Sequence, residues 1–304
     1  MLPAPLRAMR PHQWVKNVFV LAAFGFALGD LGHELRAGAA LNVVLAFFAF
    51  SLGASAIYLV NDVLDVEADR VHPTKRHRPI AAGELGVPAA LGMALALAAG
   101  ALVLAYFAAP GFALPGVVLG YMTMNLFYSI KLKHIVIVDV FCIATGFLLR
   151  VIGGGLAVGV EISHWLLLCT LFLALFLGFN KRRAELAAVS ADEANGAAQL
   201  GATRASLSAY DIGWLDQIVT LIAACTILCY ALYTVDAETV NKFHAGGRLL
   251  WSVPFVVFAV LRYMHLVIGC GHGENPTRIL LGGDRWFLAA LVGWAGTISL
   301  ALFG

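Results

Sequence analysis

The sequence predicts an all-α protein that crosses a membrane several times, and three observations support this. The 304 residues are 61% hydrophobic and only 12% charged, with a mean hydropathy of +0.86, whereas a soluble domain carries roughly a quarter charged residues. Apolar segments of about 20 residues, enough to cross a bilayer core of about 30 Å, recur along the chain. Only helices or closed barrels satisfy their backbone in lipid, and these segments are too long and uniform for barrel strands.

Nine segments have the length and composition of membrane spans. The first follows Trp14, an aromatic residue suited to the membrane interface, and it is shortened by Asp30 and His33. The second ends where the chain becomes acidic, and each of the others is an apolar run between polar connections. The expected spans lie near 14–31, 39–62, 86–108, 112–130, 135–157, 162–181, 215–235, 249–268 and 284–303.

The twenty lysines and arginines predict the orientation of these spans. With a cytoplasmic N-terminus, sixteen of them fall in cytoplasmic segments, only Arg36, Lys242 and Arg248 fall outside, and Arg150 lies within the fifth span. Cytoplasmic segments of membrane proteins carry such an excess of basic residues. We therefore expect a multi-pass protein of the cell membrane with a cytoplasmic N-terminus, and the odd number of spans places the C-terminus on the other side.

The segment 58–83, YLVNDVLDVEADRVHPTKRHRPIAAG, gathers charged residues at the cytoplasmic end of the second span. Asn61, Asp62, Asp65 and Asp69 are spaced by one, three and four residues, so on a helix they share one face. Mg²⁺ takes carboxylate oxygens together with substrate phosphate oxygens, and cationic side chains take the remaining phosphate charge. The sequence thus predicts a Mg²⁺–diphosphate site with Asp62, Asp65 and Asp69 as metal ligands, followed by the cations Lys75, Arg76 and Arg78.

Three further groups of polar residues either anchor helix ends at the membrane or bind phosphate. Lys181 and Arg182 end the sixth span, and Glu185 shares a helix face with Lys181. Lys16 and Asn17 enter the first span, where they either extend to the interface or line a cavity. An intramembrane arginine faces either an ion-pair partner or a polar cavity, and we favour a cavity for the third group. That group consists of Tyr128, Lys131, Lys133, Asp139 and Arg150.

The connections between spans leave no room for a soluble domain, so residues 1–304 are expected to form a single transmembrane domain. The two long cytoplasmic connections, about 63–85 and 182–214, are polar, and the second is Ala-rich and partly helical. Both suit a cap over a site. The Gly-rich connection 265–285 receives no role. The five cysteines lack metal-type pairing and are expected to be small buried apolar residues.

The motifs together resemble those of the UbiA superfamily of intramembrane prenyltransferases. Asn61-Asp62-x-x-Asp65-x-x-x-Asp69 matches the first Asp-rich motif of that superfamily, and the pattern of spans covers essentially the whole chain. The resemblance implies about nine helices around a central cavity that opens to the membrane, with the polar motifs on the cytoplasmic side. Where aromatic prenyltransferases would carry a second aspartate cluster, this chain has Lys181-Arg182-Arg183-x-Glu185.

The basic replacement looks like one branch of the superfamily, the decaprenyl-phosphate phosphoribosyltransferases of cell-wall arabinan synthesis. Residues 10–17 and 61–83 are similar to that branch as well. The resemblance implies that the phosphate of a polyprenyl (decaprenyl) phosphate attacks the anomeric carbon of phosphoribosyl diphosphate and releases diphosphate, with Mg²⁺ as cofactor. One acidic motif and several basic motifs also suit a donor with a diphosphate and a 5-phosphate, together with a lipid-phosphate acceptor.

Two alternatives remain open at this point. An aromatic prenyltransferase of quinone or haem biosynthesis would use a prenyl diphosphate and a second metal site. A transporter could use Asp139 and Arg150 in an ion path, although transporters more often place charges at mid-membrane. No nucleic-acid partner is expected, and a homo-oligomer is compatible with the sequence. The side chains expected to bind substrate are Lys16, Asn17, Asn61, Lys75, Arg76, Arg78, Tyr128, Lys131, Lys133, Asp139, Arg150, Lys181, Arg182 and Glu185.

Overall fold

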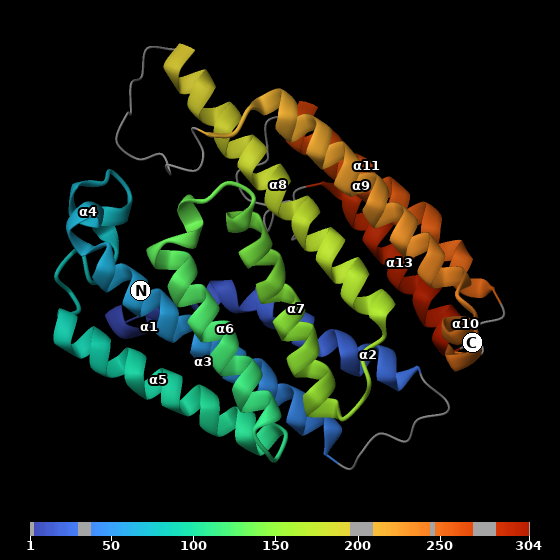
Figure 1. The fold of residues 1–304 in the computed structure, drawn as a ribbon, viewed down its shortest axis with the longest axis horizontal. Helices are drawn as coiled ribbons and strands as arrows, with labels where there is room; N and C mark the ends of the chain where they lie inside the picture. Colours follow the sequence, from blue (N-terminus) through green and yellow to red (C-terminus); the bar gives the residue numbers. More distant parts are fainter. Residues whose placement is uncertain (1–2, 30–37, 195–208, 244–246, 270–283, 304) are drawn as a thin grey trace. The chain divides into compact units, whose positions relative to one another are not determined.

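The computed structural model describes residues 3–29, 38–194, 209–243, 247–269 and 284–303, and within these ranges every regular element is a helix (Figure 1). The predicted all-α class is therefore confirmed. Seven helices are long and apolar enough to cross a membrane. They are α3 (Ala39–Leu64), α5 (Val87–Ala108), α6 (Ala113–Ile130), α7 (Val138–Val158), α8 (His164–Ala194), α9 (Ile212–Val235) and the continuous segment of η5 (Arg248–Ser252) with α11 (Val253–Gly269).

The first and last expected spans are helical but differ from the other seven. Residues near 14–31 form a 3₁₀ helix, η1 (Pro11–Leu21), which continues into the short α2 (Ala22–Leu28). The ninth expected span is α13 (Arg285–Phe303), whose apolar part is shorter than that of the seven. A 3₁₀ helix longer than three or four residues is uncommon, so the 11 residues of η1 are unusually long for this helix type. Lys16 and Asn17 lie within it.

The chain divides into two compact units, and α3 is the centre of the first. This unit comprises the described residues within 1–27, 35–132 and 146–162. Here α3 packs against α5, α6, η1 and α1 (Ala4–Met9), and two short helices, α4 (Val66–Val71) and η2 (Lys75–His77), follow it. Ala46, Ala49, Gly53 and Ala54 are buried along α3, since small residues let membrane helices approach closely.

The second unit comprises the described residues within 28–34, 133–145 and 163–304. In it α8 packs on α9, and α11 packs on both α9 and α13. Phe176 of α8, Tyr263 of α11 and Phe287 of α13 form an aromatic row, with ring centroids 5.5 and 6.3 Å apart. The connection expected at 182–214 begins as helix, because α8 continues to Ala194; residues 195–208 lie outside the described residues.

A run of three glycines allows α7 to lie against its neighbours in the first unit. A Cβ atom on Gly154 would lie 2.0 Å from the carbonyl oxygen of Val20 in η1, and one on Gly153 would lie 2.4 Å from the ring of Phe50 in α3. Real Cβ atoms do not approach a backbone oxygen this closely. The glycines therefore set the position of η1, and with it the position of Lys16 and Asn17.

Gly154→Ala should destabilise the first unit, because the new methyl group forces η1 away from α7. Overpacking of this kind costs about 1–3 kcal/mol, which should lower the unfolding temperature in detergent. The matched control is Gly120→Ala on α6, where a Cβ atom meets no other atom within 4 Å. That control should be neutral or slightly stabilising, by up to about 1 kcal/mol. Equal unfolding temperatures for the two variants would show that α7 and η1 do not make this close contact.

Candidate active site

The acidic run does not form one continuous helix. The second expected span, α3, ends at Leu64, and Asp65 has φ −94° and ψ 7° before α4 begins at Val66. Asp65 therefore ends α3 and begins α4. The prediction that the residues from Asn61 to Asp69 share one face of a single helix is wrong at this position. Asp62 and Asp69 are both buried, with 2% of each residue exposed. The break turns α4 while the two buried carboxylates still converge.

Two arginines hold the converging carboxylates. Nη1 of Arg78 donates to Asp62 Oδ1 at 3.1 Å and to Asp69 Oδ2 at 2.7 Å, so one nitrogen atom joins both side chains. Arg10 donates to the same Asp62 oxygen at 2.5 Å. Two guanidinium groups thus balance two buried carboxylates, which would repel each other strongly without a cation between them. The sequence analysis placed Arg78 at this site but did not include Arg10.

Two oxygen atoms of this cluster are available to a cation. Asn61 Oδ1 and Asp62 Oδ2 are buried and make no hydrogen bond to any described residue. Mg²⁺ takes hard oxygen ligands, commonly one or two carboxylates completed by phosphate oxygens. The donor set fits such an ion, although no three His, Cys, Asp or Glu side chains within the described ranges lie close enough to hold a metal by themselves. Phosphate oxygens from a ligand would therefore need to complete the coordination.

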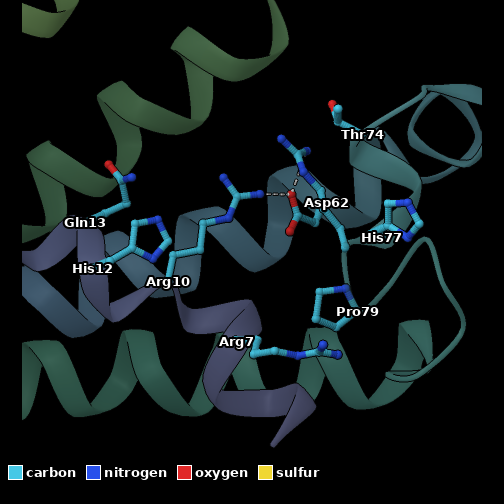
Figure 2. Close-up of a pocket in the computed structure, with 9 residues that line it drawn as sticks. Arg7, Arg10, His12, Gln13, Asp62, Thr74, His77 and Pro79 are labelled. Atoms are coloured by element: carbon cyan, nitrogen blue, oxygen red, sulfur yellow. Dashed lines mark hydrogen bonds and ion pairs between the residues drawn. The ribbon is translucent and has the colours of Figure 1, made fainter. Parts of the chain in front are cut away.

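A cavity of about 330 Å³ adjoins Asp62 (Figure 2). In Figure 2, Arg10 extends toward Asp62, and Arg7 lies on another side of the opening beside Pro79. Three guanidinium groups and one carboxylate line the cavity. The formal charge of the lining is therefore positive even with both histidines neutral. The lining residues are Arg7, Arg10, His12, Gln13, Asp62, Thr74, His77, Arg78 and Pro79.

Arg150 forms a buried polar network with η1 and α6 in the first unit. Its Nε donates to Asn17 Oδ1 at 2.6 Å, and Nη2 donates to the hydroxyl of Tyr121 at 2.8 Å. Asn17 in turn donates to Ser51 Oγ of α3 at 2.9 Å. The guanidinium carbon also lies 4.6 Å from the centre of the Tyr121 ring. Arg150 therefore contacts Asn17, another predicted site residue, and its hydrogen bonds bring η1, α6 and α7 together.

The second unit contains a separate buried ion network. Arg182 Nε donates to Asp139 Oδ2 at 2.6 Å, and its Nη1 is paired with Glu185. Arg182 is 1% exposed and Asp139 is fully buried, so this arginine is held by carboxylates. Lys181 lies 3.8 Å from Glu185 with 39% of its side chain exposed, which confirms their shared helix face. Arg183 Nε donates to Asp216 Oδ1 at 2.6 Å, and this contact ties α8 to α9.

Tyr210 completes the ion network of the second unit. Its hydroxyl donates to Asp139 Oδ1 at 2.8 Å and accepts from the backbone N–H of Ile137 at 2.7 Å. Burial raises the pKa of Tyr210 above its usual range, so the hydroxyl keeps the proton that it donates. Ile137 has φ 70°, a left-handed conformation that is strained for a β-branched residue. Tyr210 thus stabilises a strained turn directly after η3 (Leu132–His134).

The remaining predicted side chains lie at helix ends. Lys16 lies in η1 and is partly exposed. Lys75 and Arg76 lie in η2, where Arg76 is exposed. Tyr128 lies near the end of α6, Lys131 directly follows that helix, and Lys133 lies in η3.

Most of the connection 265–285, which had no assigned role, lies outside the described residues. Its described end contains Asp284, which accepts from Arg262 Nε at 3.1 Å and from Nη2 at 2.7 Å. Asp284 also accepts from the backbone N–H of Phe287 at 2.8 Å and so caps α13. These bonds, above all those from Arg262, lower the pKa of Asp284 to about 2. Asp284 therefore has a structural role at the start of the last helix.

Several site residues were missed by the sequence analysis because their partners lie far away in the chain. Arg7 pairs with Glu84, Arg10 with Asp62, and Tyr210 with Asp139. Arg10 had a visible signal, since it begins the basic stretch 10–17. Gln13 also had a signal, because its spacing places it on one helix face with Lys16 and Asn17. His12, Thr74 and His77 are polar residues on the same connections and gave no separate signal.

Comparison with known proteins identifies the family of this chain. Residues 17–268 match the UbiA prenyltransferase family. The chain belongs to this family. A decaprenyl-phosphate phosphoribosyltransferase from Mycobacterium tuberculosis is 40% identical over 98% of this chain and 93% of its own length. Enzymes of the same name from Corynebacterium glutamicum and Mycolicibacterium smegmatis are 39% and 38% identical, each over 98% of this chain and over 86% and 92% of their own lengths.

Solved structures support membership of the UbiA family at the level of fold. A UbiA homologue from Archaeoglobus fulgidus bound to GPP and Mg²⁺ has a TM-score of 0.68 at 21% identity, with 98% of this chain and 99% of that chain covered. A digeranylgeranylglyceryl phosphate synthase has a TM-score of 0.63 at 14% identity, covering 98% and 96%. The UbiA fold is therefore shared with these proteins over almost the whole chain.

Tyr210→Phe tests whether this hydroxyl holds the strained turn. Loss of the hydroxyl leaves the N–H of Ile137 and one oxygen of Asp139 without a partner, and should cost about 1–3 kcal/mol of stability. Adding Ile137→Gly should recover part of that loss, because glycine adopts φ 70° without strain. Thermal unfolding of the two single variants and the double variant measures this. Strictly additive effects would contradict the coupling between Tyr210 and the backbone of Ile137.

Proposed function

We propose that this protein transfers 5-phosphoribose from phosphoribosyl diphosphate to a polyprenyl phosphate, such as decaprenyl phosphate, and releases diphosphate. The observation that carries the proposal is the near full-length identity, about 40%, to decaprenyl-phosphate phosphoribosyltransferases. The site supports it independently, since it has one acidic cluster and a cavity lined by three arginines. The product would serve cell-wall arabinan synthesis.

The acidic cluster would hold Mg²⁺ on the diphosphate of the donor. Asp62, Asp65 and Asp69 would supply the carboxylate ligands, with Asn61 beside them. A divalent ion there would neutralise the charge that develops on the leaving diphosphate. The buried Asp62 Oδ2 and Asn61 Oδ1, which have no hydrogen-bond partner among the described residues, support this assignment. The proposal requires Arg78 to share Asp62 and Asp69 with the incoming ion or to move onto the diphosphate.

The transfer itself needs little proton chemistry from the protein. An oxygen of the lipid phosphate attacks C1 of the ribose, the bond from C1 to the diphosphate oxygen breaks, and the diphosphate leaves with the bonding electrons. The attacking oxygen is already anionic, so no general base is required. The side chains would instead bind, orient and neutralise, which is the usual source of catalysis when charge is redistributed between phosphate groups.

The predicted cations would divide into two roles. Arg10, Arg78, Lys75 and Arg76 surround the acidic cluster in sequence or in space and would bind the donor. The exposed Lys131 and the partly exposed Lys16, Lys133 and Lys181, with Tyr128, would bind the remaining phosphate groups. The buried side chains Asn17, Arg150, Asp139 and Arg182, with the partly exposed Glu185, would mainly hold these groups in place through the hydrogen bonds described above.

We further propose a single UbiA domain with nine membrane helices and a cytoplasmic N-terminus in the cell membrane. The excess of basic residues on one side supports this orientation. The active site would then face the cytoplasm, where a soluble phosphorylated donor is available, and the connections at 63–85 and 182–214 would cap it. The count of nine includes η1 with α2 and the shorter α13.

Purified protein in detergent with labelled phosphoribosyl diphosphate, Mg²⁺ and a polyprenyl phosphate tests the proposed reaction. We expect a labelled lipid, and no activity with a prenyl diphosphate and an aromatic acid. Asp65→Asn should reduce kcat at least about a hundredfold through loss of electrostatic stabilisation. The control Glu67→Gln changes an exposed carboxylate on α4 that pairs with Arg70, and it should leave kcat unchanged. Activity only in the prenyl diphosphate assay would refute the proposal.

A further inference from the structure

The lining of the cavity beside Asp62 includes one cation, Arg7, that the Mg²⁺–diphosphate assignment does not use. Arg10 and Arg78 pair with Asp62, and Arg78 also pairs with Asp69, so these two arginines belong to the acidic cluster. Arg7 pairs instead with Glu84, which lies outside the lining. A phosphate monoester carries about −1.5 to −2 charges at pH 7 and therefore needs a cation besides those that bind the diphosphate. A diphosphate bound through Mg²⁺ would have much of its charge neutralised by the metal and by Arg10 and Arg78 beside it.

We propose that this cavity binds the phosphate monoester of the donor, its 5-phosphate, and that Arg7 is the residue that recognises it. This inference rests on the proposed function and names a binding subsite within it. A prenyl diphosphate carries no phosphate monoester besides its diphosphate. Arg7 would therefore also discriminate between phosphoribosyl diphosphate and prenyl diphosphate donors.

Arg7 has donors that the folded chain leaves available. Its Nη2 pairs with Glu84, whose side chain is 45% exposed and lies outside the cavity lining. Its Nε is buried and makes no hydrogen bond to any described residue. Exposed ion pairs of this kind contribute little to stability, and the pairing with Glu84 occupies only one nitrogen of the guanidinium group. Arginine binds phosphate through two parallel N–H groups, which suits the unoccupied side of Arg7.

The backbone places Arg7 and Arg10 at the same cavity. Arg10 ends α1 with φ 53° and ψ 56°, and its N–H donates to the carbonyl oxygen of Arg7. A left-handed conformation is unusual for arginine, and strained residues of this kind cluster at ligand sites. The turn directs the chain from α1 into η1, so that both arginines and His12 line the opening shown in Figure 2. Thr74 and His77 from the connection after α4 complete the polar lining.

Two fragments of the donor separate this subsite from the diphosphate site. Ribose 5-phosphate carries only the monoester, and inorganic diphosphate with Mg²⁺ carries only the leaving group. Isothermal titration of the full-length protein in detergent should show binding of both fragments. Arg7→Gln should weaken binding of ribose 5-phosphate and of phosphoribosyl diphosphate about ten- to a hundredfold, the range for hydrogen bonds to a charged group. Binding of inorganic diphosphate should change less than about twofold.

Glu84→Gln and Arg7→Lys serve as matched variants. Glu84→Gln breaks the same ion pair and should leave ribose 5-phosphate binding unchanged, whereas Arg7→Lys should retain part of that binding through its charge. A wild-type protein that does not bind ribose 5-phosphate, or an equal loss of both fragments in Arg7→Gln, would overturn the subsite. Absence of lipid product together with Arg7-dependent binding of ribose 5-phosphate would refute the proposed function and support the subsite.

Discussion

The sharing of one arginine nitrogen between Asp62 and Asp69 is the interaction on which the candidate site depends. Buried carboxylates are stable only when cations balance them, and Nη1 of Arg78 contacts both. The arrangement joins the end of α3 to α4 and to the basic connection that follows. It also leaves Asp62 Oδ2 and Asn61 Oδ1 without partners among the described residues. Arg10 and Arg78 thus balance the charges of Asp62 and Asp69, and these two oxygen atoms could still serve a metal that arrives with a phosphate ligand.

The two units use buried arginines in different ways. In the first unit Arg150 is held by Asn17, Tyr121 and a backbone oxygen, and these neutral partners leave its charge intact within the bundle. In the second unit Arg182 is neutralised by Asp139 and Glu185. The first arrangement keeps positive potential in the unit that holds the acidic cluster and the cavity. The second fixes the start of α7, and the neighbouring Lys181 is the more exposed cation of this network.

The sequence predicted the elements whose signals are local. The long apolar runs predicted the helices, and the spacing from Asn61 to Asp69 predicted that these polar side chains lie close together. Contacts between distant residues could not be predicted in the same way: Arg7 meets Glu84 across 77 positions, and Tyr210 meets Asp139 across 71. The break at Asp65 was missed because it depends on how α4 packs after α3 ends. Arg182 was predicted to bind phosphate from its charge, its place at the end of the sixth span and the resemblance of its motif, whereas its burial against Asp139 has no signature in the local sequence.

Asp62 and Asp69 would hold a metal only together with the donor, since the described carboxylates do not form a complete metal site alone. Mn²⁺ binding to the purified protein can be measured by electron paramagnetic resonance with and without phosphoribosyl diphosphate. We expect Mn²⁺ to bind weakly alone and tightly with the donor, after correction for its binding to free donor, and we expect Asp62→Asn to lose that gain in affinity. Equally tight Mn²⁺ binding without the donor, or a gain that survives Asp62→Asn, would contradict this expectation.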